Sequence, residues 1–185
     1  MIYPIVAYGH PVLKTKGKDI EKGEMDVKTL VDDMFETMYN ANGVGLAAPQ
    51  IGKSLRLFVI DTDPIDEEED QPKVKKAFIN PQILDEEGEE WAFEEGCLSI
   101  PNIREDVNRK PNIRIKYFDE NWEEHEEEYD GFVARVIQHE YDHIEGILFT
   151  DHLSAFKKRI LKGKLANISK GKVPADYKML FSLKK

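Results

Sequence analysis

Residues 136–146 read VIQHEYDHIEG and place His139 and His143 four positions apart, with Glu140 directly after the first histidine. Apolar residues recur at helical spacing from Phe132 onward and Gly146 ends the run, which predicts a buried helix. On a helix, residues four apart lie on one face, so both imidazoles can reach one metal ion at roughly 2 Å each. Glu140 then lies beside the ion, in position to handle a proton of the attacking water. The alternative is a helix that carries these residues by accident.

The third ligand separates the possible enzyme classes, because a catalytic metal site normally has three protein ligands and one open position. In the metzincin pattern the third histidine would fall on Phe149, which cannot bind a metal. A later carboxylate, as in thermolysin-like enzymes, is also hard to find, since Asp176 is the only acidic residue beyond Asp151. His152 is expected to be a helix-start or surface histidine rather than a ligand.

Upstream, the stretch EEGCLSIP contains Cys97, the only cysteine of the chain. A lone cysteine is most often a buried core residue. Here Gly96 precedes it and permits an unusual turn or a close approach, and a thiolate would complete a set of two histidines and one cysteine for a divalent ion.

A third stretch, GVGLAAPQIG at residues 43–52, combines glycines with small residues and Gln50. On its own it predicts a loop against which a ligand or another strand packs closely. It has too few glycines and no lysine for a phosphate-binding loop.

The rest of the chain predicts several short strands and two more helices. Apolar residues recur at helical spacing over residues 26–40, with Asp26 as a plausible N-cap. Segments rich in Ile, Phe, Tyr and Val predict strands at residues 55–62, 76–84, 90–96 and 112–120, and the charged segment 122–132 predicts a solvated edge strand.

A terminal helix is expected from about residue 153 to 165, capped by Asp151 or Ser154, and these residues are expected to face inward: Leu153, Phe156, Ile160 and Leu161. The sequence therefore predicts a single α+β domain over residues 1–185, with short antiparallel or mixed strands around a central metal-binding helix, an N-terminal helix and a C-terminal helix. Residues 63–76 are expected to form an exposed loop without a catalytic role.

Composition and charge narrow the class of protein. The chain has 185 residues, of which 41% are apolar and 34% charged, as in a folded globular protein. With one cysteine it forms no intrachain disulfide, and neither a signal peptide nor a membrane-spanning run is recognisable, so the cytoplasm is expected. Residues 1–156 hold 16 Lys and Arg against 35 Asp and Glu, whereas residues 157–185 hold 10 against Asp176 alone. Such a basic tail can bind phosphate groups, although a helix face exposed to solvent also explains the excess of lysine and arginine.

Taken together, the stretches GVGLAAPQ, EGCLS and QHEYDH resemble, in this order and at these separations, the three signature motifs of peptide deformylase. The resemblance extends from YGHPVL near the N-terminus through the final helix. It implies removal of the N-formyl group from the initiator methionine of nascent proteins. It also implies one divalent metal ion per chain, natively Fe(II), with Zn, Ni or Co able to occupy the site.

Residue by residue, the resemblance implies that Cys97, His139 and His143 bind the metal, and that Glu140 is the general acid and base. The side-chain amide of Gln50 and the backbone N–H of Leu98 resemble the pair that stabilises the oxyanion. The remaining candidates surround the substrate: Val44, Phe93, Phe132 and Val136 as an apolar side-chain pocket, Gly45 as a source of backbone hydrogen bonds, Arg104 near the peptide, and Glu95 as a support of the metal site. For each pocket residue taken singly, simple core packing explains it equally well, and an exposed ion pair could explain Glu95 or Arg104.

Three residues depart from the commonest pattern of the family. His10 and Asn42 stand where acidic residues are common, and Arg135 stands in a usually apolar place on the metal-binding helix. None of these is a proposed ligand, so the departures concern peptide preference rather than chemistry.

The expected partners are N-formylmethionyl nascent peptides, with docking on the ribosome through the basic segment at about residues 153–185, and neither DNA nor membranes. Two other functions remain open at this point. One is an endopeptidase of the HExxH class, which lacks a suitable third ligand downstream. The other is a non-catalytic metal-binding or ribosome-binding module, which the basic tail favours.

Overall fold

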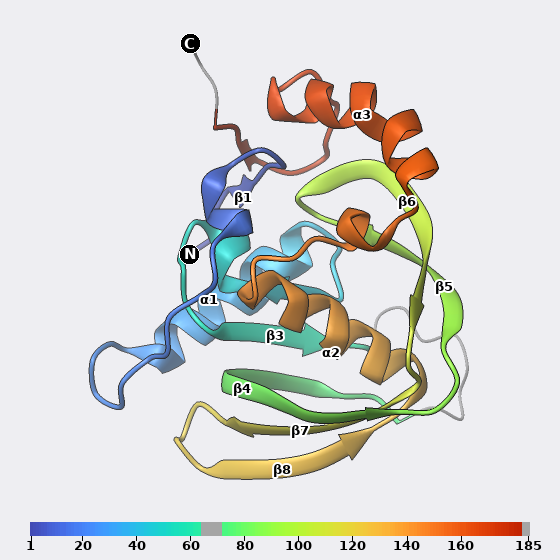
Figure 1. Cartoon of the computed structure of the whole chain (residues 1–185). Coiled ribbons are helices and arrows are strands. Elements are labelled where there is room, and N and C mark those ends of the chain that lie inside the picture. The colour runs from blue at the N-terminus through green and yellow to red at the C-terminus, as the bar shows by residue number, and fades with distance from the viewer. Residues whose placement is uncertain (64–71, 183–185) are drawn as a thin grey trace.

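A computed structural model describes residues 1–63 and 72–182 of the chain (Figure 1). Most of the predicted loop at 63–76 therefore lies outside the described residues. The helices are α1 (Val27–Asn40), α2 (Gly131–Ile144) and α3 (Ala155–Ser169). The strands are β1 (Ile5–Val6), β2 (Gly45–Ala47), β3 (Leu57–Asp61), β4 (Lys75–Glu87), β5 (Trp91–Cys97), β6 (Ile100–Arg109), β7 (Asn112–Phe118), β8 (Glu124–Tyr129) and β9 (Met179–Leu180).

The strands form three separate sheets. Five antiparallel strands follow the order β2-β3-β4-β7-β8, β5 pairs with β6 in an antiparallel hairpin, and β1 pairs with β9 in parallel. The predicted α+β class, with mixed strands around a central helix, is confirmed. The parallel pair joins segments close to the two ends of the chain, because Ile5 pairs with Met179 and Val6 with Leu180.

Strand β3 explains how α2 comes to lie inside the molecule. All five of its residues are buried, and its side chains alternate between two faces. Leu57 and Val59 pack in one apolar cluster with residues of α1, whereas Phe58 and Ile60 pack in another with residues of α2. The helices α1 and α2 thus cover opposite faces of the sheet at β3, and the face of α2 that points to the sheet is buried against it (Figure 1).

Helix α2 ends where the sequence predicts. Gly146 has a φ of +76°, in the left-handed region that glycine adopts readily. A Cβ at this position would lie 2.8 Å from the carbonyl oxygen of Lys14, so a side chain has no room there. The Asp26 side chain caps α1 by accepting a hydrogen bond from the N–H of Thr29 at 3.1 Å, as expected.

The terminal helix differs from the prediction. Ser154 is its N-cap, whereas Asp151 accepts a hydrogen bond from the N–H of Leu148 one turn earlier. The expected inward positions of Phe156 and Ile160 are wrong, because their side chains are 70% and 61% exposed. Leu153 and Leu161 are buried as expected, and the helix also buries Leu165 and Ile168. Phe156 and Ile160 are therefore exposed to solvent on the same helix as the lysines of α3.

Strand β6 was not predicted, and the segment 43–52 forms the short strand β2 followed by the 3-10 helix η2 (Ala48–Ile51). Within the described residues, no helix is long and apolar enough to cross a membrane.

Candidate metal centre and active site

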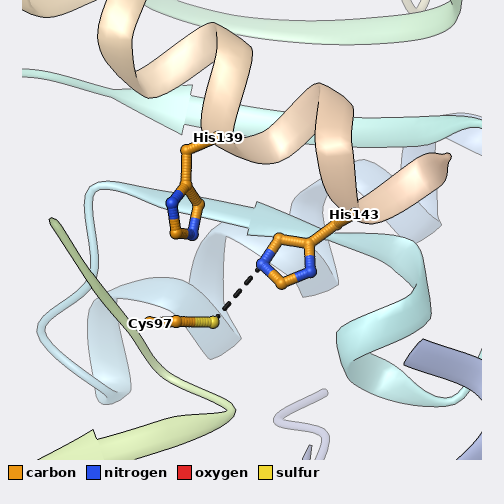
Figure 2. Close-up of side chains that lie close together, drawn as sticks. All are labelled: Cys97, His139 and His143. Carbon is orange, nitrogen blue, oxygen red and sulfur yellow. Dashed lines mark hydrogen bonds between the residues drawn. The ribbon is translucent and has the colours of Figure 1, made fainter. Parts of the chain in front are cut away.

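Two elements bring the three predicted metal ligands together. His139 and His143 project from successive turns of α2, and Cys97 faces them from the end of β5 (Figure 2). A register shift in the β5–β6 pairing between Gly96 and Cys97 turns the strand at this point. The sulfur of Cys97 and one ring nitrogen of each histidine all lie within 4.8 Å of one another. The structure thus has the trio that the sequence predicted.

The chemistry of these donors suits a cation. Cys97 Sγ lies 3.3 Å from His143 Nε2, and the two imidazole centroids are 5.1 Å apart. Burial, reinforced by the charge of His139, holds the pKa of His143 well below its usual range, so this ring is a neutral ligand. Burial opposes charge on His139 too, but hydrogen bonds to Cys97 and Glu95 raise its pKa well above the ordinary value. The site stabilises a positive charge at this point, and a thiolate and two imidazoles fit a divalent transition metal.

Glu95 orients His139 from a buried ion-pair network. Glu95 is 5% exposed, and its Oε1 lies 2.9 Å from His139 Nδ1. The guanidinium of Arg109 donates to both of its oxygens at 2.8 and 3.0 Å, and Arg135 donates to Oε2 at 2.9 Å. Burial alone would raise the pKa of Glu95, but hydrogen bonds from His139 and Arg109 hold it well below its usual range. An exposed ion pair is therefore the wrong interpretation of Glu95.

Arg135, the residue that departs from the family pattern, is buried in this network. Its guanidinium also donates to the carbonyl oxygens of Val107 and Trp91, both at 2.7 Å, and lies over the Trp91 ring at 4.7 Å. Its charge is therefore directed toward the β5–β6 hairpin. The network extends further through Arg109, which donates to Asp142 at 2.8 Å.

Glu140 has the properties of a proton carrier. It is 4% exposed, and its Oε2 has no hydrogen-bond partner among the described residues. Burial raises the pKa of Glu140 to about 7, against the opposing charge of His139. A group with such a pKa can both accept and donate a proton near neutral pH. The backbone of Gly45 lies directly against this carboxyl, since a Cβ on Gly45 would be 2.5 Å from Glu140 Oε1.

Gln50 brings a hydrogen-bond donor to the same place from η2. Its Oε1 accepts a hydrogen bond from the N–H of Ala47 at 3.0 Å, which fixes the orientation of the amide. Its Nε2 then lies 3.4 Å from Cys97 Sγ and 3.2 Å from Ser99 Oγ. Leu98 and Ser99 form the turn between β5 and β6. Of the predicted oxyanion pair, Gln50 therefore contacts Cys97 through its side chain, and Leu98 follows Cys97 directly in the chain.

The predicted pocket residues lie on α2 or close to it. Val136 is buried in the cluster that α2 forms with the sheet, and Val44 and Phe132 pack against that cluster. The rings of Phe93 and Phe132 are 5.8 Å apart. Arg104 is exposed and donates to Glu94 at 2.8 Å, so for this residue the exposed ion pair is present.

Sequence reasoning missed the supporting residues Ser99, Arg109 and Asp142. Ser99 stands inside the EGCLS motif and Asp142 between the two histidines, so their positions were a usable signal. Arg109 has no such signal, because 14 positions separate it from Glu95. His152 is not a ligand in this arrangement; its Nε2 lies 2.8 Å from Asp142 Oδ2.

Comparisons with known proteins agree with this geometry. The family described as polypeptide deformylase matches residues 2–159. A peptide deformylase from Cytophaga hutchinsonii is 65% identical over 185 residues, with both chains covered completely, and one from Flavobacterium psychrophilum is 54% identical over 193 residues, again over the full length of both.

Solved structures are similar over nearly the whole chain. A peptide deformylase from Legionella pneumophila superposes with a TM-score of 0.81 at 38% identity, covering 94% of this chain and all of that one. One from Ehrlichia chaffeensis, solved in complex with actinonin, superposes with a TM-score of 0.83 at 33% identity, covering 94% of this chain and 99% of that one.

Proposed function

The chain belongs to the peptide deformylase family, and we propose that it removes the N-formyl group from the N-terminal methionine of newly synthesised proteins in the cytoplasm, with Cys97, His139 and His143 as the metal ligands. The observation that supports this most is the carboxyl of Glu140, which is buried, follows the ligand His139 directly in the chain, and has no hydrogen-bond partner at Oε2 among the described residues. When bound there, a divalent ion supplies Lewis-acid chemistry, polarising the formyl oxygen and making water nucleophilic at neutral pH. Fe(II) is the proposed native ion, because the resemblance to the family implies it and a set of two histidines and one cysteine can bind it.

Glu140 moves the protons of the reaction. With a pKa near 7 it accepts a proton from the attacking water and later gives it to the departing α-amine, which releases formate. The buried site protects this carboxyl from bulk water, so its pKa is set by the protein rather than by solvent.

Gln50 and Leu98 stabilise the oxyanion of the tetrahedral intermediate. The Gln50 amide is preorganised by its bond from Ala47, and the Leu98 N–H is part of the turn next to Cys97. Each such donor can contribute on the order of 3 kcal/mol to transition-state stabilisation.

The substrate binds through its methionine side chain and its first peptide units. Val44, Phe93, Phe132 and Val136 form the apolar pocket for that side chain, and Gly45 offers backbone hydrogen bonds to an extended peptide. Arg104, exposed beside Gly96, contacts the peptide further along. Glu95 holds His139 in the orientation that its ligand role requires.

The test is formate release from formyl-Met-Ala-Ser by protein purified without oxygen, with metal content measured in parallel. Glu140→Gln keeps the shape of the side chain but cannot carry the proton, so we expect activity to fall by about 10³-fold while the metal content stays unchanged. Unformylated peptide is the control for endopeptidase activity. The proposal is wrong if iron-loaded or nickel-loaded protein releases no formate, or if the Glu140→Gln variant remains as active as the wild type.

We also propose that the basic terminal helix docks on the ribosome. The exposed side chains of Phe156 and Ile160 lie on the same helix as its outward-facing lysines, which suits an anionic surface with apolar contacts. Deleting residues 166–185 would also remove β9, so surface substitutions are the better test. Lys158→Glu with Lys162→Glu should abolish co-sedimentation with ribosomes at low salt.

The control for this test makes the same change of charge elsewhere on the surface. Lys22 and Lys28 are exposed and precede or begin α1, so Lys22→Glu with Lys28→Glu should leave co-sedimentation unchanged. Equal binding of the two double variants would reject docking through α3.

A further inference from the structure

The C-terminal segment beyond α3 returns to the active site. Residues 170–182 follow the end of the helix, and β9 pairs with β1 through hydrogen bonds from Ile5 N–H to the carbonyl oxygen of Lys178 and from Ala7 N–H to that of Leu180, both 2.9 Å long. This segment lies outside residues 2–159, the part of the chain that the deformylase family matches. It contains none of the residues to which the resemblance assigns a role.

Tyr177 in this segment contacts the turn that carries the oxyanion donor. Its hydroxyl donates a hydrogen bond of 2.7 Å to the carbonyl oxygen of Leu98, across 79 positions of sequence. The Tyr177 ring is half-buried and packs against the same apolar cluster as the Leu98 side chain. Burial raises the pKa of Tyr177, so the hydroxyl keeps its proton and acts as a donor at any physiological pH.

The turn is anchored at further points by other parts of the chain. The carbonyl oxygen of Ser99 accepts a hydrogen bond from the N–H of Tyr8 at 2.9 Å, and Ser99 Oγ accepts one from Gln50 Nε2 at 3.2 Å. Both of these bonds fix Ser99. The bond from Tyr177 instead fixes the peptide plane that follows Leu98.

This difference matters because peptide units are rigid planes linked by two soft dihedral angles per residue. The Leu98 N–H belongs to one plane and the Leu98 carbonyl to the next, so holding the carbonyl restricts the dihedral angles that aim the N–H. An oxyanion donor is effective only when it is aimed in advance at the position where the charge develops.

We propose that Tyr177 is a positioning residue for deformylation, whose hydroxyl holds the Leu98 carbonyl and thereby aims the Leu98 N–H at the oxyanion. The inference rests on the proposed function, because it assumes that Leu98 is the backbone donor. Tyr177 itself does not touch the substrate. Through Tyr177, the C-terminal segment would affect the rate of the chemical step (kcat) rather than the binding of substrate (KM).

The variant that tests this is Tyr177→Phe, which keeps the ring and removes only the hydroxyl. Ser182→Ala is the matched control, since it removes another hydroxyl of the same segment, one that donates to the carbonyl oxygen of Gly9 at 3.4 Å, remote from the metal ligands in sequence. Both variants and the wild type are assayed as full-length, metal-loaded protein for kcat and KM on formyl-Met-Ala-Ser. Amide exchange is measured by NMR on the zinc-loaded protein, because Zn²⁺ is diamagnetic.

For Tyr177→Phe we expect kcat to fall by about 10-fold, part of the loss that follows removal of a whole oxyanion donor, with KM and metal content unchanged. The Leu98 and Ser99 amides should exchange faster, while the Ile5 and Ala7 amides, which pair with β9, stay as protected as in the wild type. Ser182→Ala should change neither kcat nor the exchange of the turn.

The proposal is overturned if Tyr177→Phe matches Ser182→Ala in kcat, or if its loss of kcat comes with faster exchange at Ile5 and Ala7, since that would mean a loosened segment rather than a misaimed turn. Failure of the proposed function is a distinct result, because then the wild type itself releases no formate, and this proposal falls with it.

Discussion

The contact between Gly45 and Glu140 makes the most direct test of how closely the acid-base group is packed. Replacing Gly45 with alanine adds one methyl group 2.5 Å from Glu140 Oε1 and 2.8 Å from its Cδ and Cγ. Ordinary contacts between such atoms are about 3.5 Å or longer, so the carboxyl has to move by about 1 Å. Because Glu140 is buried, it cannot swing into solvent to relieve the contact.

The expected effect follows from this displacement. Misplacing a catalytic group by about 1 Å can cost about 10²-fold in rate, so kcat for formyl-Met-Ala-Ser should fall by that order in Gly45→Ala. The added methyl also overpacks the site, which should lower the free energy of unfolding by about 1–3 kcal/mol. The backbone N–H and C=O of residue 45 remain, so KM should change much less than kcat.

Gly163→Ala is the control for a glycine substitution as such. A Cβ at Gly163, inside α3, meets nothing within 4 Å. This variant should keep the wild-type kcat and gain about 1 kcal/mol of stability from helix propensity. A Gly45→Ala enzyme that bound its metal and kept kcat within about threefold of the wild type would refute the argument, because Glu140 would then tolerate the displacement.

Three further predictions concern stability and metal loading. Arg135→Met leaves part of the charge of buried Glu95 unpaired, so it should lower the free energy of unfolding of the metal-free protein by about 3 kcal/mol in urea titrations. The control Arg114→Met breaks an exposed ion pair and should lower it by less than about 1 kcal/mol. Equal losses in the two variants would contradict a structural role for the network. Burial would raise the pKa of Glu127, but hydrogen bonds from a lysine and two tyrosines lower it to about 2, so this carboxylate stabilises the fold above its ordinary pKa and the contribution is lost as the pH falls toward 2. Urea titrations should accordingly show a stability difference between the wild type and Glu127→Gln that is largest near neutral pH and vanishes in acid, and a difference independent of pH would count against it. Dialysis against a strong chelator should abolish formate release and added Fe(II), Ni(II) or Zn(II) should restore it, whereas full activity in metal-free protein would exclude a catalytic role for the ion.

Local patterns in the sequence were sufficient for the two histidine ligands of the site. Histidines four apart on an amphipathic run fix two ligands on one helix face, and this depends only on helix geometry, so the prediction holds in the structure. Cys97 was already a candidate third ligand from its own sequence context, and the resemblance then assigned a role to it and to Gln50. The structure brings the side-chain atoms of these two residues, which come from other elements, to within 3.4 Å of each other.

The supporting network shows where local patterns stop. From the sequence, Arg135 was only a charged residue at a usually apolar position of the metal-binding helix. No local pattern predicts that it pairs with Glu95, which lies 40 positions earlier. Strand β6 was missed because Pro101 and Asn102 at its start resemble a turn, and Asn102 does adopt a left-handed φ of +64°. Pairing with β5 at Ile100 and again from Arg104 to Arg109 overrides that signal, while residues 101–103 lie in the register shift between these two parts.

By itself, the sequence determined the α+β class, the metal-binding helix and the identity of the three ligands, because these depend on short-range periodicity and on motifs that are contiguous along the chain. Only the tertiary structure decided which face of α3 is buried, how Glu95 is neutralised and that Tyr177 reaches Leu98. Each of these depends on contacts between residues far apart in sequence, whose partners are chosen by packing and burial rather than by local propensity.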